Sequence, residues 1–354
     1  MNELRFGILG CGNISKTHAV AVTNAKGAIL SAVCDIVESK AGDLGAKYGV
    51  PFFSDCEAFF KEVDVVLVCL PSGMHAEYAV RAADQGKHVL TEKPLDITFA
   101  NGIRMVEQCE SAGVTLGCIS QHRFARDVQA LKAAAESGEL GKLIEGDAYI
   151  KWYRSQGYYD SAGWRGTYEM DGGGCLMNQG VHYIDMIQWI MGGIASVQAR
   201  ARTAMHSIEV EDQAMAIVEY KNGALGVIQG STATYPGLSE RLEVHGTMGS
   251  VVVEGDRAKV WTVKPTDQHE AFGPMVSLGQ SRELTDDPTL KDWDELHRLQ
   301  IENFAQSILN SQAPFITGRQ ALEPLKVILA IYESVRRGGS KVTLDEIATG
   351  RDGA

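Results

Sequence analysis

The sequence predicts an α/β protein with two domains: first a doubly wound parallel sheet, then an α/β domain whose sheet is mainly antiparallel. The chain has 354 residues, more than one ordinary hydrophobic core accommodates. Up to about residue 121, short apolar runs alternate with helical patterns, as in doubly wound domains. Between residues 194 and 263, strand patterns follow one another, with Asn-Gly or Gly in several turns. We therefore expect domains over 1–121 and 122–354.

Composition excludes several classes of protein. Apolar residues make up 45 % and charged residues 22 % of the chain, as in a soluble globular protein. The formal net charge of −12 argues against nonspecific binding of nucleic acid or acidic membranes. No apolar run approaches the roughly 20 residues that span a bilayer, and no signal-peptide pattern precedes the first strand. We expect a cytoplasmic protein with no nucleic-acid or membrane partner.

Seven cysteines occur without a C-x-x-C pair, mostly inside apolar runs. An odd number in such positions favours reduced packing residues over a disulfide framework or a zinc knuckle. The chain also lacks HExxH and a third ligand at suitable spacing, so we predict no metal site.

The first domain contains five apparent strands that are almost continuously apolar and rich in Val, Ile and Leu. This composition suits a parallel sheet covered on both faces. Between the strands lie helical stretches such as 76–86, which Gly86 ends. The predicted strands cover 5–10, 28–35, 63–71, 88–94 and 114–120.

The second domain has a different rhythm. A polar and aromatic loop over 154–171 leads into a helical pattern over 172–189, and strands dominate from 194 to 263. Turns at 221–224 and 246–250 favour hairpins. Residues 264–295 contain Pro and Asp and look irregular. The remaining predicted elements are a helix near 124–137, a strand over 144–153, and helices over 296–311 and 321–339.

The stretch GILGCGNIS (7–15) follows a predicted strand and opens a predicted helix. Gly10 allows a tight turn there, and Gly12 lets the backbone approach a pyrophosphate that the helix N-terminus attracts. Ser15 stands where Gly or Ala is usual. Asp35 ends the second strand about 20 residues later, where a carboxylate binds the adenosine ribose. Because that carboxylate would repel a 2′-phosphate, the pattern favours NAD over NADP.

A lysine stands where ligands bind in such sheets, beyond the carboxyl end of a strand. The strand over 88–94 ends in Thr91, Glu92, Lys93 and Pro94. A cis Lys93–Pro94 bond, a conformation typical of proline, would turn the lysine inward toward a nicotinamide. The alternative interpretation is a surface lysine at the start of a helix.

In the helical pattern over 172–189, Asn178, His182 and Asp185 share one face. Met177, Val181, Ile184 and Ile187 form an apolar face. Oxidation of an alcohol needs a base for the hydroxyl proton, and histidine suits this role near neutral pH. His182 is our candidate base, Asn178 would orient a neighbouring hydroxyl, and Asp185 would fix the tautomer of His182. Three glycines before the helix would let it press against backbone or ligand. A purely structural Asn–His–Asp network is the alternative.

Five stretches together resemble the Gfo/Idh/MocA family of sugar and inositol oxidoreductases, and the resemblance covers almost the whole chain. It implies an N-terminal Rossmann domain and a C-terminal α/β domain with a large open sheet that supports dimers or tetramers. It also implies that Lys93 and His182 are catalytic. Many members carry Asp where this chain has Asn178, which places more weight on the other two. The stretches are GILGCGNIS (7–15), PSGMHAEYA (71–79), GKHVLTEKP (86–94), GGGCLMNQGVH (172–182) and AIYESVRRGGSKV (330–342).

Within that family, the run from Gln156 to Trp189 is similar to the branch that includes UDP-N-acetylglucosaminuronate 3-dehydrogenases. Arginine forks suit a diphosphate or a carboxylate. The implied cofactor contacts are Gly10, Gly12, Asn13, Ile14, Asp35, Pro71, His75, Glu92, Lys93, Trp164 and Arg165. The implied substrate contacts are Arg123, Tyr153, Arg154, Gln156, Tyr159, Asn178 and His182.

We expect an NAD-dependent dehydrogenase acting on a ring hydroxyl of a sugar or nucleotide sugar. The alternatives are an inositol or free-sugar dehydrogenase, an NAD-dependent glycosidase, and a regulator that holds NAD(H) without turnover. We also expect a homodimer or homotetramer, because the alternation over 213–233 leaves Gly226, Ile228 and Gly230 on a face that no later helix obviously covers.

Overall fold

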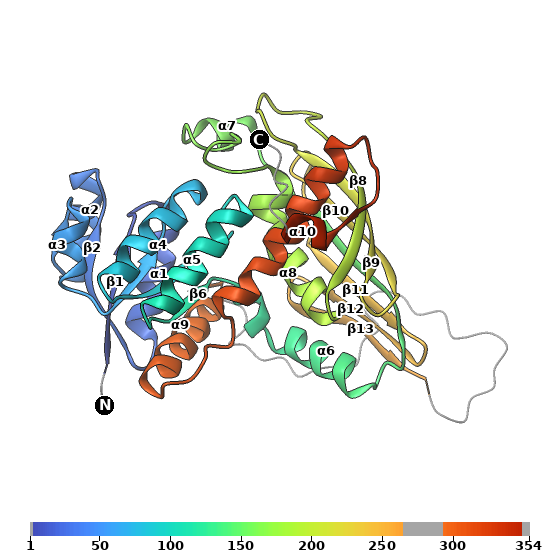
Figure 1. The fold of residues 1–354 in the computed structure, drawn as a ribbon, viewed down its shortest axis with the longest axis horizontal. Coiled ribbons are helices and arrows are strands. Elements are labelled where there is room, and N and C mark those ends of the chain that lie inside the picture. The colour runs from blue at the N-terminus through green and yellow to red at the C-terminus, as the bar shows by residue number, and fades with distance from the viewer. Residues whose placement is uncertain (1–2, 265–292, 349–354) are drawn as a thin grey trace. The chain divides into compact units, whose positions relative to one another are not determined.

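The computed structural model describes residues 3–264 and 293–348, which divide into two compact units (Figure 1). The first unit contains the chain up to Gln121 together with later segments. The second is not one continuous stretch, because residues 169–172 and the chain from α9 (Trp293–Leu309) through Leu325 pack with the first unit. Most of the region predicted to be irregular (264–295) lies outside the described residues.

The first unit is built on a six-stranded parallel sheet in the order β3-β2-β1-β4-β5-β6. This is the strand order of a Rossmann domain, in which β1 and β4 pair where the winding reverses. β3 was missed in the sequence because its two residues are too short to show a period. The strands are β1 (Leu4–Leu9), β2 (Ala28–Cys34), β3 (Phe52–Phe53), β4 (Val65–Val68), β5 (His88–Thr91) and β6 (Leu116–Cys118).

Helices pack around this sheet and fill its core with small and branched residues. The contact between α1 and α9 explains why the later helix belongs to the first unit. Phe304 of α9 is buried with Ile8 and Leu67 of the sheet. The helices are α1 (Asn13–Asn24), α2 (Glu38–Tyr48), α3 (Cys56–Phe60), the 3₁₀ turn η1 (Ser72–Met74), α4 (His75–Asp84) and α5 (Phe99–Ser111).

The second unit is built on an eight-stranded sheet in the order β13-β12-β11-β7-β10-β9-β8-β14. All its pairs are antiparallel except β7 with β10, so the predicted mainly antiparallel sheet is confirmed. Its strands are β7 (Leu143–Lys151), β8 (Ile194–Arg202), β9 (Gln213–Tyr220), β10 (Leu225–Ser231), β11 (Arg241–Gly246), β12 (Gly249–Glu254), β13 (Arg257–Val263) and β14 (Val342–Thr343).

Helices cover one face of the second sheet. α6 and α8 contact each other, and α8 packs on β7 and β11. The first residues of α10 belong to the first unit and its remaining residues to the second. The helical segments are η2 (Gln121–Phe124), α6 (Arg126–Ser137), α7 (Gln156–Asp160), the π-helix η3 (Cys175–Gly180), α8 (Val181–Ile190), α10 (Gly318–Arg336) and α11 (Leu344–Ala348).

The uncovered face of this sheet is not the one that the sequence predicted. A Cβ on Gly230 would lie 2.7 Å from Leu176 of η3, and Ile228 is only 1 % exposed. Both therefore lie on the face that helices cover, together with Gly226. Met215, Ile217 and Leu225 are 49 %, 58 % and 58 % exposed on the opposite face. The alternation of residues separated the two faces of the sheet correctly, but the face that we expected to be free of helices is the one that they cover.

Two further expectations can be compared with the structure. All seven cysteines are free, and six of them are buried. In the described part of the chain, no helix combines the length and apolar character needed to cross a bilayer.

Candidate active site

The loop between β1 and α1 is shaped to receive a phosphate group. Gly10 has φ +99°, and a Cβ there would lie 2.5 Å from the carbonyl oxygen of Cys69, so only glycine fits. Gly12 precedes α1, and a Cβ there would meet nothing within 4 Å. No side chain caps this helix. Its first N–H groups, beginning at Asn13 and Ile14, are therefore placed to bind an anion in the open space above Gly12.

Asp35 closes the side of this loop. Its carboxylate accepts hydrogen bonds from the backbone N–H groups of Cys11 and Val37, each at 2.8 Å. The first bond joins the glycine loop to the end of β2. The half-buried side chain lies where the ribose of a dinucleotide binds in such folds. The N–H groups at the start of α1 suit the pyrophosphate, and the Asp35 carboxylate suits the ribose hydroxyls. These groups therefore fit the adenosine diphosphate half of NAD.

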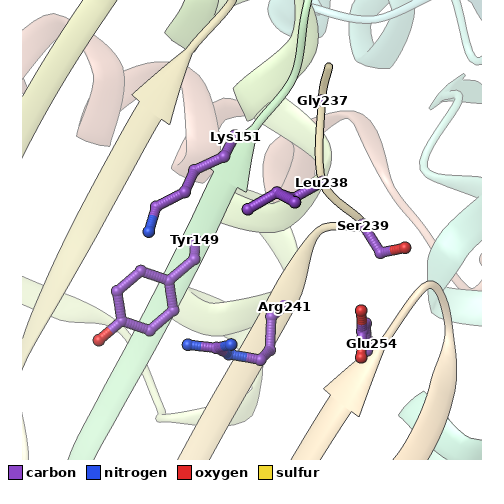
Figure 2. Close-up of a pocket in the computed structure, with 7 residues that line it drawn as sticks. All are labelled: Tyr149, Lys151, Gly237, Leu238, Ser239, Arg241 and Glu254. Atoms are coloured by element: carbon purple, nitrogen blue, oxygen red, sulfur yellow. The ribbon is translucent and has the colours of Figure 1, made fainter. Parts of the chain in front are cut away.

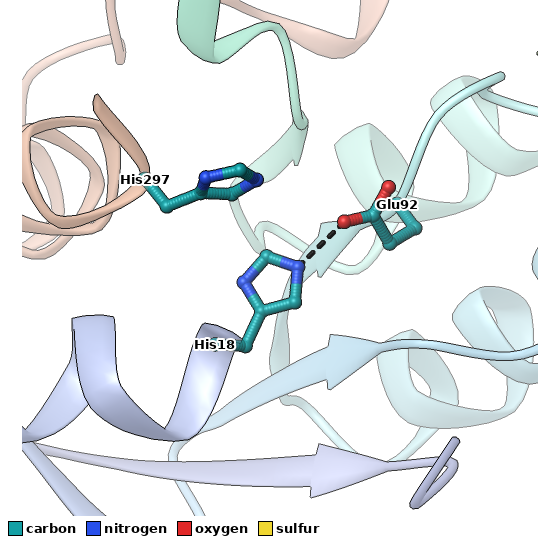
Figure 3. Close-up of side chains that lie close together, drawn as sticks. All are labelled: His18, Glu92 and His297. Atoms are coloured by element: carbon teal, nitrogen blue, oxygen red, sulfur yellow. Dashed lines mark hydrogen bonds and ion pairs between the residues drawn. The ribbon is translucent and has the colours of Figure 1, made fainter. Parts of the chain in front are cut away.

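The β5 end carries Lys93 at the carboxyl edge of the same sheet, two strands from β1. The Lys93–Pro94 bond is cis. Glu92 is buried and accepts hydrogen bonds from His18 at 2.6 Å and from the backbone N–H of Lys93 at 3.1 Å (Figure 3). Burial alone would raise the pKa of Glu92, but the hydrogen bond and the positive charges of His18, Lys93 and His297 lower this pKa to about 2. An anion therefore stands beside Lys93 throughout the neutral range.

His18, Glu92 and His297 converge, with ligand atoms within 4.8 Å of one another (Figure 3). Such a group could hold a metal ion. However, the 2.6 Å between His18 Nε2 and Glu92 Oε1 is a direct hydrogen bond, shorter than the ~3.3 Å between two ligands of a tetrahedral zinc ion. This geometry fits a buried hydrogen-bonded pair better than a metal centre.

His75 connects the turn after β4 to the turn after β5. Its two ring nitrogens lie 2.8 Å from the carbonyl oxygen of Pro94 and 3.0 Å from that of Leu70. Both nitrogens are therefore used within the protein. This geometry favours a role in holding the Lys93–Pro94 turn over the direct cofactor contact expected for His75. Pro71 begins the neighbouring 3₁₀ turn and remains half-exposed.

The glycines before α8 allow a close approach to backbone, one of the two possibilities that the sequence left open. A Cβ on Gly174 would lie 1.7 Å from the carbonyl oxygen of Glu211, and one on Gly173 would lie 2.1 Å from the hydroxyl of Tyr332. The buried Glu211 carboxylate accepts hydrogen bonds from the N–H of Gly174 and Leu176 and from Tyr332. Sequence reasoning missed Glu211, because it lies 35 residues beyond the helix that it holds.

The predicted continuous helix over 172–189 begins with the π-helix η3, and α8 starts at Val181. Asn178 lies in η3 and His182 in the first turn of α8. π-helical turns are frequent at functional sites. The segment is not amphipathic in the usual sense, because every residue of α8 except Trp189 is buried. His182 is 7 % exposed.

Asp185 and Arg123 are placed differently from the prediction. The two carboxylate oxygens of Asp185 accept hydrogen bonds from Arg123 at 2.7 and 2.5 Å, so its main partner is this arginine and not the imidazole of His182. Arg123 is 1 % exposed, and its guanidinium stacks 4.8 Å from the ring of Trp189. This burial argues against the direct substrate contact expected for Arg123. A buried bidentate ion pair is a structural feature that sequence spacing cannot reveal.

The ring that lies against His182 belongs instead to His122. The centroids of the two imidazoles are 4.8 Å apart, with an interplanar angle of 68°. His122 Nδ1 lies 2.6 Å from a carboxylate oxygen of Asp256, in the turn between β12 and β13. Neither residue was predicted, because 134 positions separate them in the chain.

Two arginines from the loop over 154–171 converge on Tyr158. The guanidinium carbons of Arg154 and Arg165 lie 5.1 and 4.4 Å from its ring centroid, and Arg165 donates to its hydroxyl at 2.5 Å. Arg165 also stacks on Trp164 at 4.6 Å. Within residues 3–264 and 293–348, neither arginine forms a salt bridge, and the Nε atom of each is buried without a hydrogen-bond partner. Among the described residues, the loop thus presents two guanidinium groups that form no salt bridge.

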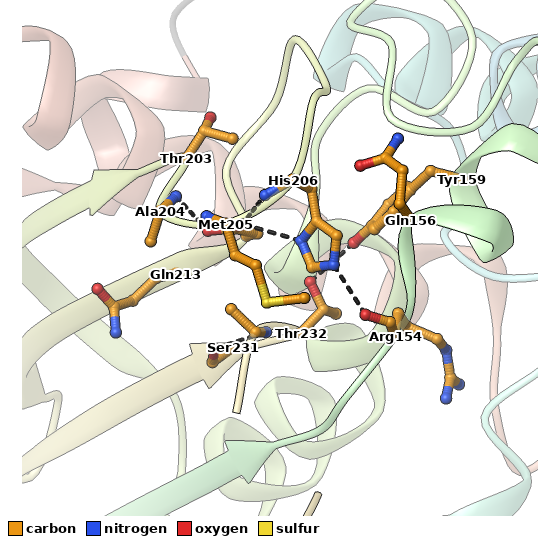
Figure 4. A network of polar contacts seen from close by, with 12 residues as sticks. Arg154, Gln156, Tyr159, Thr203, Ala204, Met205, His206, Gln213, Ser231 and Thr232 are labelled. Atoms are coloured by element: carbon orange, nitrogen blue, oxygen red, sulfur yellow. Dashed lines mark hydrogen bonds and ion pairs between the residues drawn. The ribbon is translucent and has the colours of Figure 1, made fainter. Parts of the chain in front are cut away.

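A histidine network holds this loop by its main chain (Figure 4). His206 lies 2.9 Å from a carboxylate oxygen of Asp212 and 2.8 Å from the carbonyl oxygen of Arg154. Burial raises the pKa of Tyr159 despite the hydrogen bond of 2.7 Å between its hydroxyl and Thr232. Because that hydroxyl is used internally, the structure favours packing over substrate contact for Tyr159.

Gln156 and Tyr153 are the remaining predicted substrate contacts. The Gln156 amide bonds to the N–H of Ser207 and to Asp160, each at 2.9 Å, so it also connects parts of the loop. Tyr153 is half-buried, with its ring edge-to-face against that of Tyr235 at 5.2 Å.

A separate pocket of about 420 Å³ lies on the uncovered face of the second sheet (Figure 2). Tyr149 and Lys151 point into it from β7, and Arg241 from β11. None of the predicted site residues lines it. The lining residues are Tyr149, Lys151, Gly237, Leu238, Ser239, Arg241 and Glu254.

Together the fold and the site define a dinucleotide-binding oxidoreductase with a separate α/β domain. Comparison with known families agrees in both parts. Residues 4–120 match the oxidoreductase family model with an NAD-binding Rossmann fold, and residues 128–252 match the GFO/IDH/MocA C-terminal domain. The chain belongs to the GFO/IDH/MocA family of oxidoreductases, and its cofactor is NAD.

Relatives of known activity span the full chain. It is 28 % identical over 352 residues to myo-inositol 2-dehydrogenase of Thermotoga maritima, covering 97 % of this chain and 99 % of that one. Among solved structures, it is 32 % identical to the WlbA dehydrogenase of Bordetella pertussis in complex with NADH and UDP-GlcNAcA, with a TM-score of 0.84 and coverage of 97 % and 99 %. The WlbA dehydrogenase of Chromobacterium violaceum, in the same kind of complex, is 31 % identical, with a TM-score of 0.84 and coverage of 97 % and 96 %.

Proposed function

We propose that this protein oxidises a ring hydroxyl of a sugar or nucleotide sugar and transfers the hydride to NAD. The observation that carries the proposal is Lys93 at the carboxyl end of β5, on the same sheet edge as the open loop at Gly12. Ligands of doubly wound sheets bind at this edge. An ammonium group there, with the Glu92 anion behind it, serves the reacting oxygen and not the cofactor phosphates.

The oxidation removes a proton from the hydroxyl and a hydride from the carbon, and different groups receive them. His182 accepts the hydroxyl proton, Lys93 polarises the same oxygen, and Asn178 binds a neighbouring hydroxyl. When bound, NAD⁺ accepts the hydride from the carbon. We assign the reaction to Lys93 and His182 together, because the resemblance to the family implies a catalytic role for both and each can take part in proton transfer.

The substrate class that we propose is an anionic nucleotide sugar, with UDP-N-acetylglucosaminuronate oxidised at C3 as the specific candidate. Arg154 and Arg165 support it, because two guanidinium groups without a carboxylate partner in the described chain suit a diphosphate or a carboxylate. The complexes of the two WlbA dehydrogenases with UDP-GlcNAcA also support it. We propose in addition that the protein works in the cytoplasm as a homodimer or homotetramer.

A substrate panel tests this function. The purified protein is incubated with NAD⁺ and UDP-N-acetylglucosaminuronate, UDP-N-acetylglucosamine, myo-inositol or D-glucose, with an oxo acid added to reoxidise NADH that stays bound. We expect a keto product from the acidic nucleotide sugar. Formation of product only from inositol or glucose would contradict the anionic substrate, and no product from any compound would contradict the dehydrogenase.

Two lysines that flank β5 provide a matched pair of variants. Lys93→Ala is expected to retain NAD binding and to lose about 10²- to 10⁴-fold in kcat, the usual contribution of a proton-transfer group. Lys87 precedes the opposite end of β5, and Lys87→Ala is expected to leave the rate unchanged. Equal rates for the two variants would remove Lys93 from the mechanism.

A further inference from the structure

A histidine and a carboxylate stand directly behind the candidate base. His122 in η2 packs edge-to-face against His182, with ring centroids 4.8 Å apart. Its Nδ1 lies 2.6 Å from Asp256, and the side chains of His122 and Asp256 are only 8 % and 21 % exposed. The second oxygen of the Asp256 carboxylate is buried and has no hydrogen-bond partner in the part of the chain that the structure describes. Three segments far apart in sequence thus bring an imidazole, hydrogen-bonded to a carboxylate, against the ring of His182.

The backbone at Asp256 indicates that its side chain is needed. The two-residue turn between β12 and β13 has positive φ at both positions, 54° at Gly255 and 66° at Asp256. This conformation is free of cost for glycine but unfavourable for most other residues, with Asn and Asp the best tolerated. A turn of this kind favours Gly at its second position. Aspartate at this position adopts an unfavourable backbone conformation, and its hydrogen bond to His122 compensates for that cost.

The Asp256 carboxylate also fixes the state of His122. A carboxylate accepts hydrogen bonds, so His122 donates through Nδ1, and its orientation beside His182 follows from that bond. Other ionisable groups surround the pair. Burial raises the pKa of Glu240, although His122 opposes this, and burial raises the pKa of Tyr183, aided by Asp256. The ion pair between Arg123 of η2 and Asp185 of α8 carries no net charge.

We propose that His122 and Asp256 are positioning residues for His182, holding its ring and stabilising the imidazolium that forms when it takes the substrate proton. This role rests on the proposed function of His182 as the base. The Asp256 anion acts through the intervening His122 ring and does not itself touch the substrate. The arrangement resembles in logic other sites where a carboxylate orients a histidine, but here a second imidazole lies between them.

Asp256→Asn isolates the charge of this carboxylate. Asparagine tolerates the same left-handed backbone and keeps an oxygen that accepts the hydrogen bond from His122. Losing the negative charge destabilises the imidazolium of His182, so the midpoint of its titration should fall by about one pH unit. The acidic limb of the pH profile of kcat should shift to lower pH by the same amount. At pH 7, kcat should fall at least tenfold, with KM changed less than threefold.

Three further variants separate positioning from general stability. Glu254→Gln removes the same charge two residues away and should change neither the midpoint nor kcat. Asp256→Asn combined with His182→Ala should be no slower than His182→Ala alone, because the carboxylate acts only through the base. His122→Phe keeps an aromatic ring against His182 but loses the hydrogen bond, and it should reproduce the shift in the midpoint. Circular dichroism confirms that each variant is folded.

The titration is measured in the full-length protein with bound NAD by NMR of the histidine rings, with the His182 signal assigned by its absence from His182→Ala. An unchanged midpoint in Asp256→Asn, or an equal loss of rate with and without His182, would overturn the positioning role. This measurement needs no turnover. If the midpoint falls but no substrate is oxidised by the unaltered protein, the positioning role stands and the proposed dehydrogenase fails.

Discussion

The Glu92 carboxylate is buried beside two histidines and is ionised across the neutral range. Folding lowers its pKa from an ordinary value of 4.5 to about 2, because the hydrogen bond and charge of His18 outweigh burial. Ionised Glu92 therefore stabilises the folded state above about pH 4.5, and this contribution is lost as the pH falls toward 2. A shift of this size corresponds to about 3 kcal/mol.

We predict that Glu92→Gln lowers the free energy of unfolding of the first unit by about 3 kcal/mol at pH 7. The difference from the unaltered protein should shrink as the pH falls from about 4.5 toward 2, because Glu92 becomes protonated in the unfolded chain below 4.5 while it stays ionised in the folded protein until the pH nears 2. Thermal denaturation between pH 7 and pH 3 measures this trend. Glu110→Gln is the control, since Glu110 pairs with Arg319 on the surface and should give no change. A difference that stays constant with pH would contradict the ion pair.

The Arg123–Asp185 pair is a second buried pair of charged residues whose loss should destabilise the folded protein. Removing one partner of a buried ion pair leaves an uncompensated charge and costs about 3–5 kcal/mol. We predict this loss for Arg123→Ala, measured by chemical denaturation of the second unit. Arg319→Ala removes a solvent-exposed bidentate pair and should be neutral. A neutral Arg123→Ala would indicate that the guanidinium is not buried, and would restore Arg123 as a substrate contact.

At the scale of elements, two glycines that begin or precede helices serve opposite purposes. Gly12 faces open space at the start of α1, whereas Gly174 touches Glu211 before η3. We predict that Gly12→Ala leaves the melting temperature unchanged and weakens NAD binding at least tenfold, because the new methyl group occupies the space of the pyrophosphate. Isothermal titration with NAD⁺ measures the affinity. Unchanged affinity would place the phosphates elsewhere.

Gly174→Ala should have the reverse effect on stability. Its Cβ would lie 1.7 Å from a backbone oxygen, so η3 and the start of α8 must move. We predict a loss of several kcal/mol and of all activity, whatever the substrate. Gly157→Ala is the matched control in the same unit, because its nearest contact would be an ordinary 3.6 Å. Retention of a normal melting temperature in Gly174→Ala would show that this segment adapts.

The elements also show what sequence reasoning can reach. The Gly10–Gly12 loop, Asp35 and Lys93 were found because local chemistry defines them: positive φ, a helix N-terminus and a strand end. The Arg123–Asp185 and His122–Asp256 pairs depend on contacts between residues 62 and 134 positions apart, and η3 is held by Glu211, 35 positions from Leu176. Periodicity does not encode such contacts. The three glycines before η3 were the signal that a backbone segment approaches closely, but not which one.

At the scale of the whole molecule, the feature of interest is the face of the second sheet on which apolar side chains are exposed. Ile217 and Met215 of β9 and Leu225 of β10 form an exposed apolar strip on adjacent strands, opposite the face that η3 and α8 cover. The pocket in Figure 2 lies on the same face. Apolar strips of this kind on a large sheet are typical of association surfaces.

We predict that a second copy of the chain covers this strip, and that Ile217→Glu dissociates the oligomer. A carboxylate at its centre would have to be buried without a partner on association, at a cost that the interface cannot offset. Light scattering after size exclusion, at micromolar concentration, should show a dimer or tetramer for the unaltered protein and a monomer for the variant. Ile36→Glu, at a 90 % exposed apolar position in the first unit, is the control and should not change the mass. A monomeric unaltered protein would contradict the association, and an oligomer that survives Ile217→Glu would place the interface on another surface.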